Sequence, residues 1–306
     1  MTTTVTTTVT TTPAPVGAAW QDRTMSRSTT HRHPAGTARP SPGSVRSIAW
    51  VDGRVVPAAD ATIPLTDDGF LRGDAVFDAM LVRDGRTHAM DAHLARLRRS
   101  AQALDLRLPV VRQVVTDLLA AWGERDGMLR VIVTRGGNVR GLLATLPSIA
   151  SQSLYVLDIP WRTVLTGVKT LSYATNMWAT REAARHEADD ALIATDGVLH
   201  ELPTGAICLV HDGAVGSPDH EQLPLLDSVT LAELRKVTEV AATVPTLDDL
   251  RAADELFVVS AARPVVPVHA VLVGDEELRF PSPGPVTARL KDAFDAHVRD
   301  TLDPRP

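Results

Sequence analysis

Lysine is the residue type in this chain that most directly suggests covalent chemistry, and it occurs at three positions, Lys169, Lys236 and Lys291. Lys236 and Lys291 lie in amphipathic patterns that predict helices over 230–242 and 286–301, where a charged side chain most simply faces water. Lys169 lies instead beside a mixed polar and apolar run, where loss of water could lower the pKa of its amine towards the nucleophilic range. We therefore take Lys169 as a candidate nucleophile, with a solvated surface lysine as the alternative.

Composition and charge exclude several classes of protein. The net charge is -6, the pI is about 5.9 and the arginines are scattered along the chain, so no nucleic-acid partner is expected. Cys208 is the single cysteine, which rules out an intramolecular disulfide and a cysteine-based zinc site, and we predict no bound metal. The opening lacks the features of a signal peptide, and no stretch approaches the ~20 apolar residues of a membrane span. We predict a cytoplasmic protein with no membrane partner.

The sequence divides into a polar tail and two folded units. Residues 1–45 have few large apolar side chains to offset the entropy of ordering them, and we predict a disordered tail. The first, smaller unit is predicted over 46–158, with a linker over 159–166 that contains Pro160. The second, larger unit is predicted over 167–303.

Secondary structure follows from the hydrophobic periodicity and from turn residues. Four Asp-Gly pairs separate short β-like runs and predict hairpin turns, at 52–53, 84–85, 196–197 and 212–213. The first unit is predicted to contain strands at 47–51, 54–56, 75–82, 128–134 and 153–157 and helices at 91–104 and 109–122. The second is predicted to contain helices at 176–186, 230–242 and 286–301 and strands at 191–194, 207–210, 255–260 and 265–273. The fold class is therefore α+β.

Two segments resemble the fold-type IV family of pyridoxal-phosphate enzymes, the class IV aminotransferases. Residues 167–218, which begin GVKTLSYATNM, are similar to the family segment in which a lysine precedes a helix, a strand, an Asp-Gly turn and a glutamate. Residues 72–104, which include GDAVFD and HLARLRRSA, resemble an upstream family segment. The resemblance covers roughly 47–270. It implies the two-domain, D-amino acid aminotransferase-like fold, with a small α/β domain and a larger β-rich domain, in a homodimer.

The resemblance also implies roles for individual residues. Lys169 would form the Schiff base with pyridoxal 5′-phosphate, and Glu201 would keep the pyridine nitrogen of the cofactor protonated, which makes the ring an electron sink. Arg96 would hold the cofactor phosphate with the paired donors of its guanidinium. Further cofactor contacts are expected from Tyr173, Thr204, Leu226, Asp227 and Ser260. Without the resemblance, Glu201 would be interpreted as a solvated carboxylate and Arg96 as a surface arginine.

The reaction is less closely defined, and the first hypothesis is a lyase. Residues 129–142 and 254–271 resemble segments of 4-amino-4-deoxychorismate lyase, which forms 4-aminobenzoate and pyruvate in folate biosynthesis. Arg135 and Arg140 are then candidate ligands of the substrate carboxylates. The second hypothesis is an aminotransferase for branched-chain or D-amino acids on the same scaffold.

A third alternative, a non-catalytic relative, rests on departures from the family pattern. The small-residue turn after the glutamate reads 202–206 here, LPTGA, in which Thr204 alone keeps a hydroxyl. The phosphate-binding Gly-Ile-Thr-Arg element reads Leu225-Leu226-Asp227-Ser228, where Asp227 would repel phosphate unless it caps the following helix. The segment between Tyr155 and Lys169 is also shorter than in the family.

Overall fold

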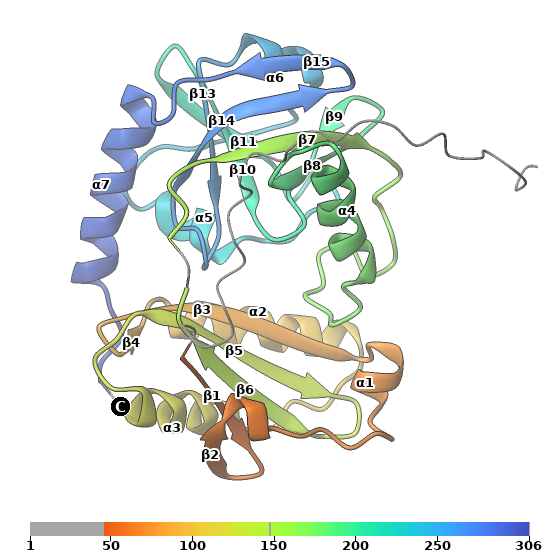
Figure 1. Ribbon diagram of the computed structural model, residues 1–306, viewed down its shortest axis with the longest axis vertical. Coiled ribbons are helices and arrows are strands. Elements are labelled where there is room, and N and C mark those ends of the chain that lie inside the picture. The colour runs from red at the N-terminus through yellow and green to blue at the C-terminus, as the bar shows by residue number, and fades with distance from the viewer. Residues whose placement is uncertain (1–45, 147, 306) are drawn as a thin grey trace, which may run out of the picture. The chain divides into compact units, whose positions relative to one another are not determined.

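The structure is a computed structural model and describes residues 46–146 and 148–305, so the tail predicted at 1–45 lies outside the described residues. The described elements form two sheets with covering helices (Figure 1). The first sheet and its helices contain β1 (Ser47–Val51), β2 (Arg54–Pro57), the 3-10 helix η1 (Ala58–Asp60), α1 (Asp68–Arg72), β3 (Ala75–Arg83), β4 (Arg86–Thr87), α2 (Met90–Ala103), α3 (Arg112–Trp122), β5 (Gly127–Thr134) and β6 (Val139–Ala144). The second contains β7 (Gln152–Asp158), α4 (Ala174–Arg185), β8 (Asp190–Thr195), β9 (Val198–Leu199), β10 (Ala206–His211), β11 (Ala214–Pro218), α5 (Val229–Leu234), β12 (Ala241–Thr243), α6 (Leu247–Ala252), β13 (Glu255–Val259), β14 (Val266–Val273), β15 (Glu276–Arg279) and α7 (Pro285–Asp300).

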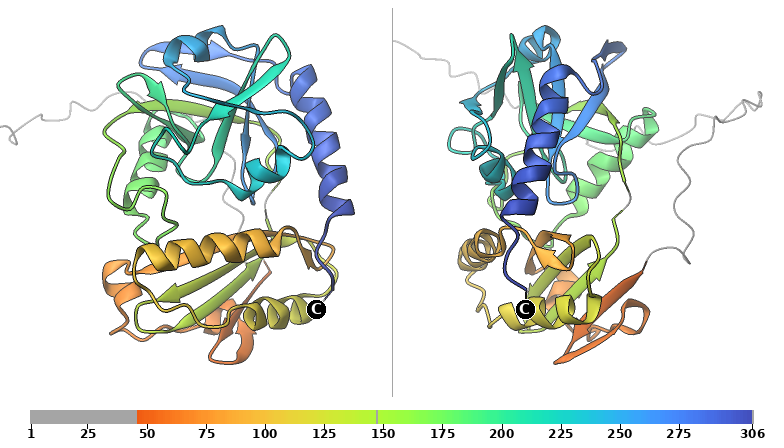
Figure 2. Two further views of the ribbon diagram at one scale, coloured as in Figure 1. Left: turned by 180° about the vertical axis from the view of Figure 1, so that it is seen from behind. Right: turned by 90° about the vertical axis from the view of Figure 1, so that its left-hand side faces the viewer.

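The first sheet has six antiparallel strands in the order β2-β1-β6-β5-β3-β4. Side chains alternate between the faces of a strand. One face, which includes Val76, Met80 and Leu129, packs with α2 and α3 in a single core (Figure 2). The opposite face of the same strands carries Phe77 and Arg130, which line a cavity described below. The alternation therefore separates a packing face from a cavity face.

All four turns predicted at Asp-Gly pairs are formed. The φ angles of Asp52 and Gly53 are 50° and 84°, and the pairs at 84–85, 196–197 and 212–213 also have positive φ at both residues. Two successive positive φ values define the type I′ turn, which glycine and aspartate accommodate and which matches the twist of a hairpin. Local turn chemistry thus fixes the register of these hairpins, as between β1 and β2, where Val51 pairs with Arg54.

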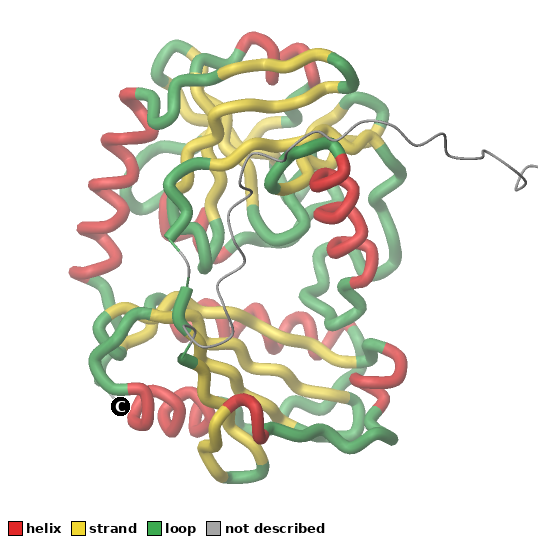
Figure 3. Tube along the Cα trace, viewed as in Figure 1, coloured by secondary structure: helices red, strands yellow, loops and turns green. Residues whose placement is uncertain are grey.

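The second sheet has nine strands, with the main order β12-β11-β10-β13-β14-β7-β8-β9 and with β15 paired to β14. One face of β10 and β13, which includes Cys208 and Phe257, packs on α5 and α7, while the other face forms a second core with α6. Helix α4 covers β7 and β8. Figure 3 shows the strands of this sheet together, with α7 beside them. The second sheet is thus enclosed by helices and carries the larger share of the chain, as predicted.

The structure corrects the predicted boundary between the units. A strand forms at 152–158, but β7 pairs in parallel with β14 and β8 of the second sheet rather than closing the first. The boundary therefore lies between Ala144 and Gln152 and not near 159. The apolar run of β7 is compatible with either sheet, and strand pairing between distant segments decides which sheet β7 joins.

The helix predicted over 230–242 is also wrong in its length. Helix α5 ends at Leu234, and residues 241–243 form β12, which pairs in parallel with β11 through Gly216 and Ala241. The last part of this segment contains the β-branched residues Val237, Thr238 and Val240, which favour extended backbone. Pairing with β11 therefore outweighs the helical periodicity.

Two segments tie the second unit to the first sheet. The backbone around Lys169 bridges to β3, since Thr170 pairs with Val76. Near the C-terminus, the carbonyl oxygens of Leu302 and Asp303 accept hydrogen bonds from Arg86 at 2.7 and 2.8 Å. Among the described residues, no helix combines the length and the apolar character that crossing a membrane requires.

Candidate active site

A cavity of about 610 Å³ lies where the free face of the first sheet meets loops of the second. It is lined by most of the predicted site residues: Lys169, Arg96, Glu201, Tyr173, Thr204, Leu226 and Ser260. Asp227, Arg135 and Arg140 are not among its lining residues. Residues predicted from segments far apart in the chain thus come together at one cavity.

The main chain of Lys169 is held between β3 and α2. Its carbonyl oxygen accepts a hydrogen bond of 3.0 Å from the amide of Phe77, and its own amide donates one of 3.0 Å to the hydroxyl of Ser100. The amine Nζ lies 4.8 Å from the centre of the Phe77 ring and 5.8 Å from that of Tyr173. Burial and the nearby Arg96 lower the pKa of the Lys169 amine to about 8. The neutral, nucleophilic fraction near neutral pH is therefore much larger than that of an ordinary lysine.

The carboxylate of Glu201 faces the same cavity. Trp161 donates to Oε1 at 3.4 Å, and the amide of Leu226 donates to Oε2 at 3.3 Å. Burial raises the pKa of Glu201 to about 7, although these two hydrogen bonds favour the charged form. Burial and Glu201 together raise the pKa of Tyr173 to about 12, so its phenol stays protonated. Glu201 is thus a carboxylate whose charge a cationic ligand would stabilise.

Arg96 is positioned by a buried network with Asp78. Its Nε and Nη2 donate to the two oxygens of Asp78 at 2.8 and 2.7 Å, and His93 lies 2.8 Å from the same carboxylate. Although burial raises the pKa of Asp78, Arg96 and His93 bring it well below the usual range. Nη1 donates to the carbonyl of Asp227 at 3.1 Å. A guanidinium has two protons on Nη1, so one remains for a ligand in the cavity.

Arg130 is a second cation on the cavity wall, and it has no ion-pair partner within the described ranges. Its guanidinium carbon lies 5.0 Å from the centre of the Phe77 ring, and its buried Nε has no hydrogen-bond partner. Burial lowers the pKa of Arg130. The sequence analysis did not single it out, although a lone cation in the apolar run 128–133 was a usable signal. An anionic ligand in the cavity would satisfy this group.

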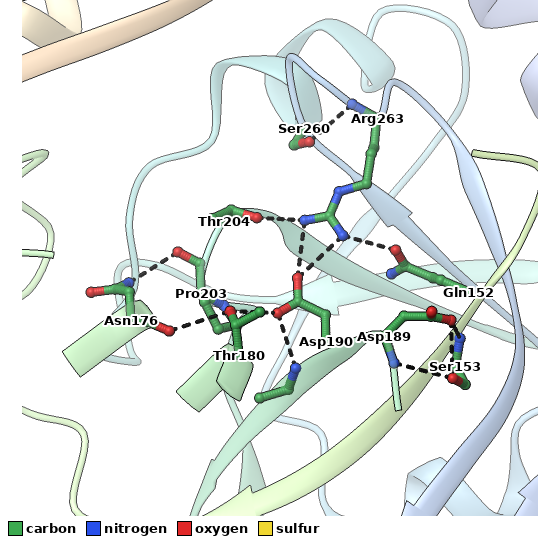
Figure 4. Close-up of polar contacts among 11 residues, drawn as sticks. Gln152, Ser153, Asn176, Thr180, Asp189, Asp190, Pro203, Thr204, Ser260 and Arg263 are labelled. Carbon is green, nitrogen blue, oxygen red and sulfur yellow. Dashed lines mark hydrogen bonds and ion pairs between the residues drawn. The ribbon is translucent and has the colours of Figure 1, made fainter. Parts of the chain in front are cut away.

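A third network fixes the loop that follows Glu201 (Figure 4). Arg263 donates to Asp190 at 3.2 Å, to Gln152 at 2.8 Å and to the hydroxyl of Thr204. Its amide also donates to the hydroxyl of Ser260 at 3.1 Å. The two hydroxyls predicted to contact cofactor are therefore held in the cavity wall by one buried arginine.

Comparisons with known proteins agree with this geometry. The family model described as amino-transferase class IV matches residues 75–271. The chain belongs to this family. A class IV relative from Mycobacterium tuberculosis, named a bifunctional aminodeoxychorismate lyase / D-amino acid transaminase, is 31% identical over 198 residues, which are 55% of this chain and 68% of that protein. A D-alanine aminotransferase from Listeria innocua is 24% identical to this chain, over 80% of this chain and 93% of the length of that protein.

Solved structures agree with the class IV fold. A Mycobacterium tuberculosis protein described as a hypothetical aminotransferase in its PLP-bound form has a TM-score of 0.72 and 27% identity, over 83% of this chain and 99% of that one. The branched-chain amino acid aminotransferase of Escherichia coli has a TM-score of 0.75 at 20% identity, which shows the shared fold. The predicted two-domain fold is confirmed, and class IV aminotransferases use pyridoxal 5′-phosphate.

The cavity of this class IV chain fits that cofactor. Lys169 could supply the amine, Glu201 a carboxylate for the ring nitrogen, and Arg96 a buried cation for the phosphate. Two further hydroxyl side chains at the start of α5, Ser228 and Thr230, line the cavity, and the sequence analysis missed them as ligands. Ser228 and Thr230 thus place hydroxyl groups in the segment where this chain departs from the Gly-Ile-Thr-Arg element of the family.

Asp227 does not have the helix-capping role considered for it. Ser228, rather than Asp227, caps α5 by accepting a hydrogen bond from the amide of Leu231. The Asp227 carboxylate pairs with Arg99 at 2.7 Å. The backbone carbonyl of Asp227 accepts a hydrogen bond from Nη1 of Arg96 and so helps to position that guanidinium. The expected repulsion of phosphate is thus offset by Arg99.

The two arginines predicted to bind substrate are held elsewhere. Arg135 pairs with Asp74 at 3.0 Å and donates to the carbonyls of Leu104 and Asp105. Arg140 pairs with Asp52 at 2.9 Å. Neither lines the cavity, so the structure does not support the substrate contacts inferred from the lyase-like segment. Their guanidinium groups bind carboxylates of the chain itself.

Proposed function

We propose that this chain is a pyridoxal-phosphate-dependent aminotransferase for amino acids that carry one carboxylate. The observation that carries the proposal is Arg130, a half-buried arginine that lines the cavity, has no ion-pair partner among the described residues and has a buried Nε without a hydrogen bond. Its guanidinium and the amine of Lys169 contact the same ring, Phe77. An amino acid has an amine and a carboxylate a few ångströms apart, which suits a nucleophilic amine and a cation on one wall.

Each residue of the cavity has a separate role in the proposed amino transfer. When bound, the cofactor supplies an electron sink that stabilises negative charge at the α-carbon of the substrate. Lys169, whose amine has a pKa of about 8, would accept the proton from the α-carbon of the substrate and later return it. Glu201 would hold the ring nitrogen, Arg96 with Ser228 and Thr230 would hold the phosphate, and the neutral phenol of Tyr173 would donate a hydrogen bond.

The lyase remains the second candidate, because one relative combines that activity with D-amino acid transamination. Aminodeoxychorismate has two carboxylates, and it would use a second cation beyond Arg130. Arg135 and Arg140, the cations inferred for that purpose, bind acidic residues outside the cavity. This difference favours aminotransfer as the main activity. The non-catalytic alternative loses its basis, since the family and the charged groups of the cavity support an enzyme.

The test is a direct comparison of substrates. The cofactor-loaded chain is incubated with single L- or D-amino acids and a 2-oxo acid, and in parallel with 4-amino-4-deoxychorismate, and the products are quantified. We expect a new amino acid from the first mixture. Formation of 4-aminobenzoate, with no amino transfer from either enantiomer, would replace the proposal with the lyase.

Arg130→Met tests the carboxylate contact. We expect KM for the amino acid to rise about 10- to 100-fold, which corresponds to the loss of one charge-assisted contact, while cofactor binding is retained. Arg140→Met is the matched control, because it removes an arginine that is paired outside the cavity. Equal effects of the two substitutions would contradict the assignment.

We further propose a homodimer in the cytoplasm. Three large apolar side chains at or next to α1, Leu65, Phe70 and Leu71, are more than half exposed, which is typical of surfaces that pack against another subunit. Light scattering after size-exclusion chromatography tests the dimer, and a monomeric mass would refute it. Cell fractionation tests the location.

A further inference from the structure

Three side chains that do not line the cavity converge on one point. His88 lies between β4 and α2, Glu233 in α5 and His297 in α7. Their ligand atoms all lie within 4.8 Å of one another, and this is the one such group of three among the described residues. The Oε2 atom of Glu233 is 3.1 Å from Nε2 of His297 and 3.8 Å from Nε2 of His88. Each residue therefore presents a possible metal ligand towards the other two.

The separations agree with tetrahedral coordination. Zinc binds histidine nitrogen and carboxylate oxygen at about 2.0–2.2 Å, so two ligand atoms on a tetrahedron lie about 3.3–3.5 Å apart. The distances of 3.1 and 3.8 Å lie on either side of that value. At 3.8 Å, His88 and Glu233 are too far apart for a direct hydrogen bond. The 3.1 Å contact between His297 and Glu233 is a hydrogen bond that a shared ion would replace, and the separation of His88 from Glu233 fits two ligands of one ion.

The surroundings orient the facing atoms, and a bound ion would replace the hydrogen bonds from Nε2 of His88 to Thr301 and from Nε2 of His297 to Glu233. Lys236 donates to the other carboxylate oxygen, Oε1, at 2.7 Å, and this contact orients Oε2 towards the histidines. The side chains of His88 and Glu233 are each 7% exposed, and that of His297 is 17% exposed. The hydroxyl of Thr301 lies 3.2 Å from Nε2 of His88, beside the position of a fourth ligand. The group is thus enclosed and polar on one side.

We propose that His88, Glu233 and His297 bind one divalent transition-metal ion of the Zn²⁺ type, with water beside Thr301 as the fourth ligand. Imidazole and carboxylate are ligands that zinc readily accepts. The ion joins the first sheet to α5 and α7. Because α5 also carries Thr230 at the cavity, the ion stabilises the segment that faces the cofactor phosphate. The composition argument against metal excluded cysteine sites, and this set contains no cysteine.

The experiment measures metal binding directly, on the full chain without an affinity tag and with its cofactor. After treatment with a chelator, the protein is dialysed against Zn²⁺ and analysed for metal, and its affinity is measured by competition with a chromophoric chelator. We expect one ion per chain and a rise in Tm on addition of Zn²⁺. His88→Asn, Glu233→Gln and His297→Asn should each weaken binding about 100-fold or more.

The matched control is His186→Asn. His186 and Glu182 approach to 3.8 Å on α4 but belong to no such group of three, so this variant should retain full affinity. The proposal fails if the wild-type chain binds no Zn²⁺, or if binding survives in the three variants. It also fails if His186→Asn weakens binding as much as they do. Because the wild-type stoichiometry and Tm shift need no variant, a misfolded substitution leaves the test intact, and neither readout depends on turnover.

Discussion

Arg263 and Arg130 are two arginines near the cavity, and their surroundings differ: Arg263 is buried behind the cavity residues Thr204 and Ser260, whereas Arg130 is half-buried and lines the cavity. Arg263 is bound by Asp190, Gln152 and Thr204, so its desolvation is offset within the protein. Arg130 contacts the Phe77 ring and has no ion pair within the described part of the chain. A partly buried charge without a partner is unfavourable in the empty cavity and becomes favourable when an anion binds. The first arginine is structural, and the second is available for a ligand.

The carboxylates Asp78 and Glu201 repeat this difference. Asp78 accepts hydrogen bonds from Arg96, His93 and the amide of Ala79, and its pKa is lowered. Glu201 receives two long hydrogen bonds, and burial raises its pKa to about 7. Groups whose pKa is perturbed by burial, as that of Glu201 is, are concentrated at functional sites. Substitutions in the two sets should therefore affect different properties, the first set stability and the second set activity.

The largest expected effect on activity comes from Lys169→Ala. Removal of the amine should lower kcat by at least about 1000-fold, because both the covalent attachment and the proton transfer depend on it. The visible absorbance of the lysine-bound cofactor should be lost, while Tm stays near that of the wild type, because a buried amine with a lowered pKa does not stabilise the fold. An unchanged absorbance band would show that a different lysine binds the cofactor.

The largest expected effect on stability comes from Asp190→Ala. This change leaves Arg263 buried without its counter-charge, and we expect a loss of about 3–5 kcal/mol in the free energy of unfolding, measured by denaturant titration. Asp189→Ala is the matched control, because its exposed carboxylate bonds only to Ser153 among the described residues. If both variants lose the same stability, the buried network does not have the role assigned to it.

Glu201→Gln should have opposite effects on stability and function. The folded pKa of about 7 exceeds the ordinary value of 4.5, so the folded chain holds this proton more tightly and loses stability as pH rises between these values. Without cofactor, the variant should be more stable than the wild type at pH 8, on the order of 1–3 kcal/mol, and similar at pH 4. Thermal unfolding at the two pH values measures the difference. Activity should fall in the variant, and a constant stability difference would contradict the pKa.

The smallest effect is expected from Arg135→Ala. Its guanidinium binds Asp74 and two backbone carbonyls on the surface, so kcat/KM should stay close to the wild-type value. Steady-state kinetics with the preferred amino acid checks this. A large loss of activity would return Arg135 to the substrate site and would favour the lyase.

Much of the site could be predicted from the sequence. The segment around Lys169 and Glu201 and the helix with Arg96 matched known family patterns, and the four Asp-Gly turns depend on φ preferences that are local to two residues. The two charges in strands, Asp78 and Arg130, were overlooked, although each is isolated in an apolar run. A charged residue within an apolar strand marks a position that needs a partner or a ligand, and the periodicity used to predict helices and strands does not reveal this.

The sequence alone determined the family, the hairpin turns and the lysine, because these depend on local residue order. The tertiary structure decided which sheet β7 joins, where α5 ends and which arginines face the cavity, because strand pairing and ion pairing act between residues far apart in the chain. Arg130 and Arg135 illustrate this, since they are neighbours in one segment but face different surroundings. The tertiary structure also brought His88, Glu233 and His297 together. Each of them is more than 60 residues from the next in the chain, so no pattern in the sequence indicated this group.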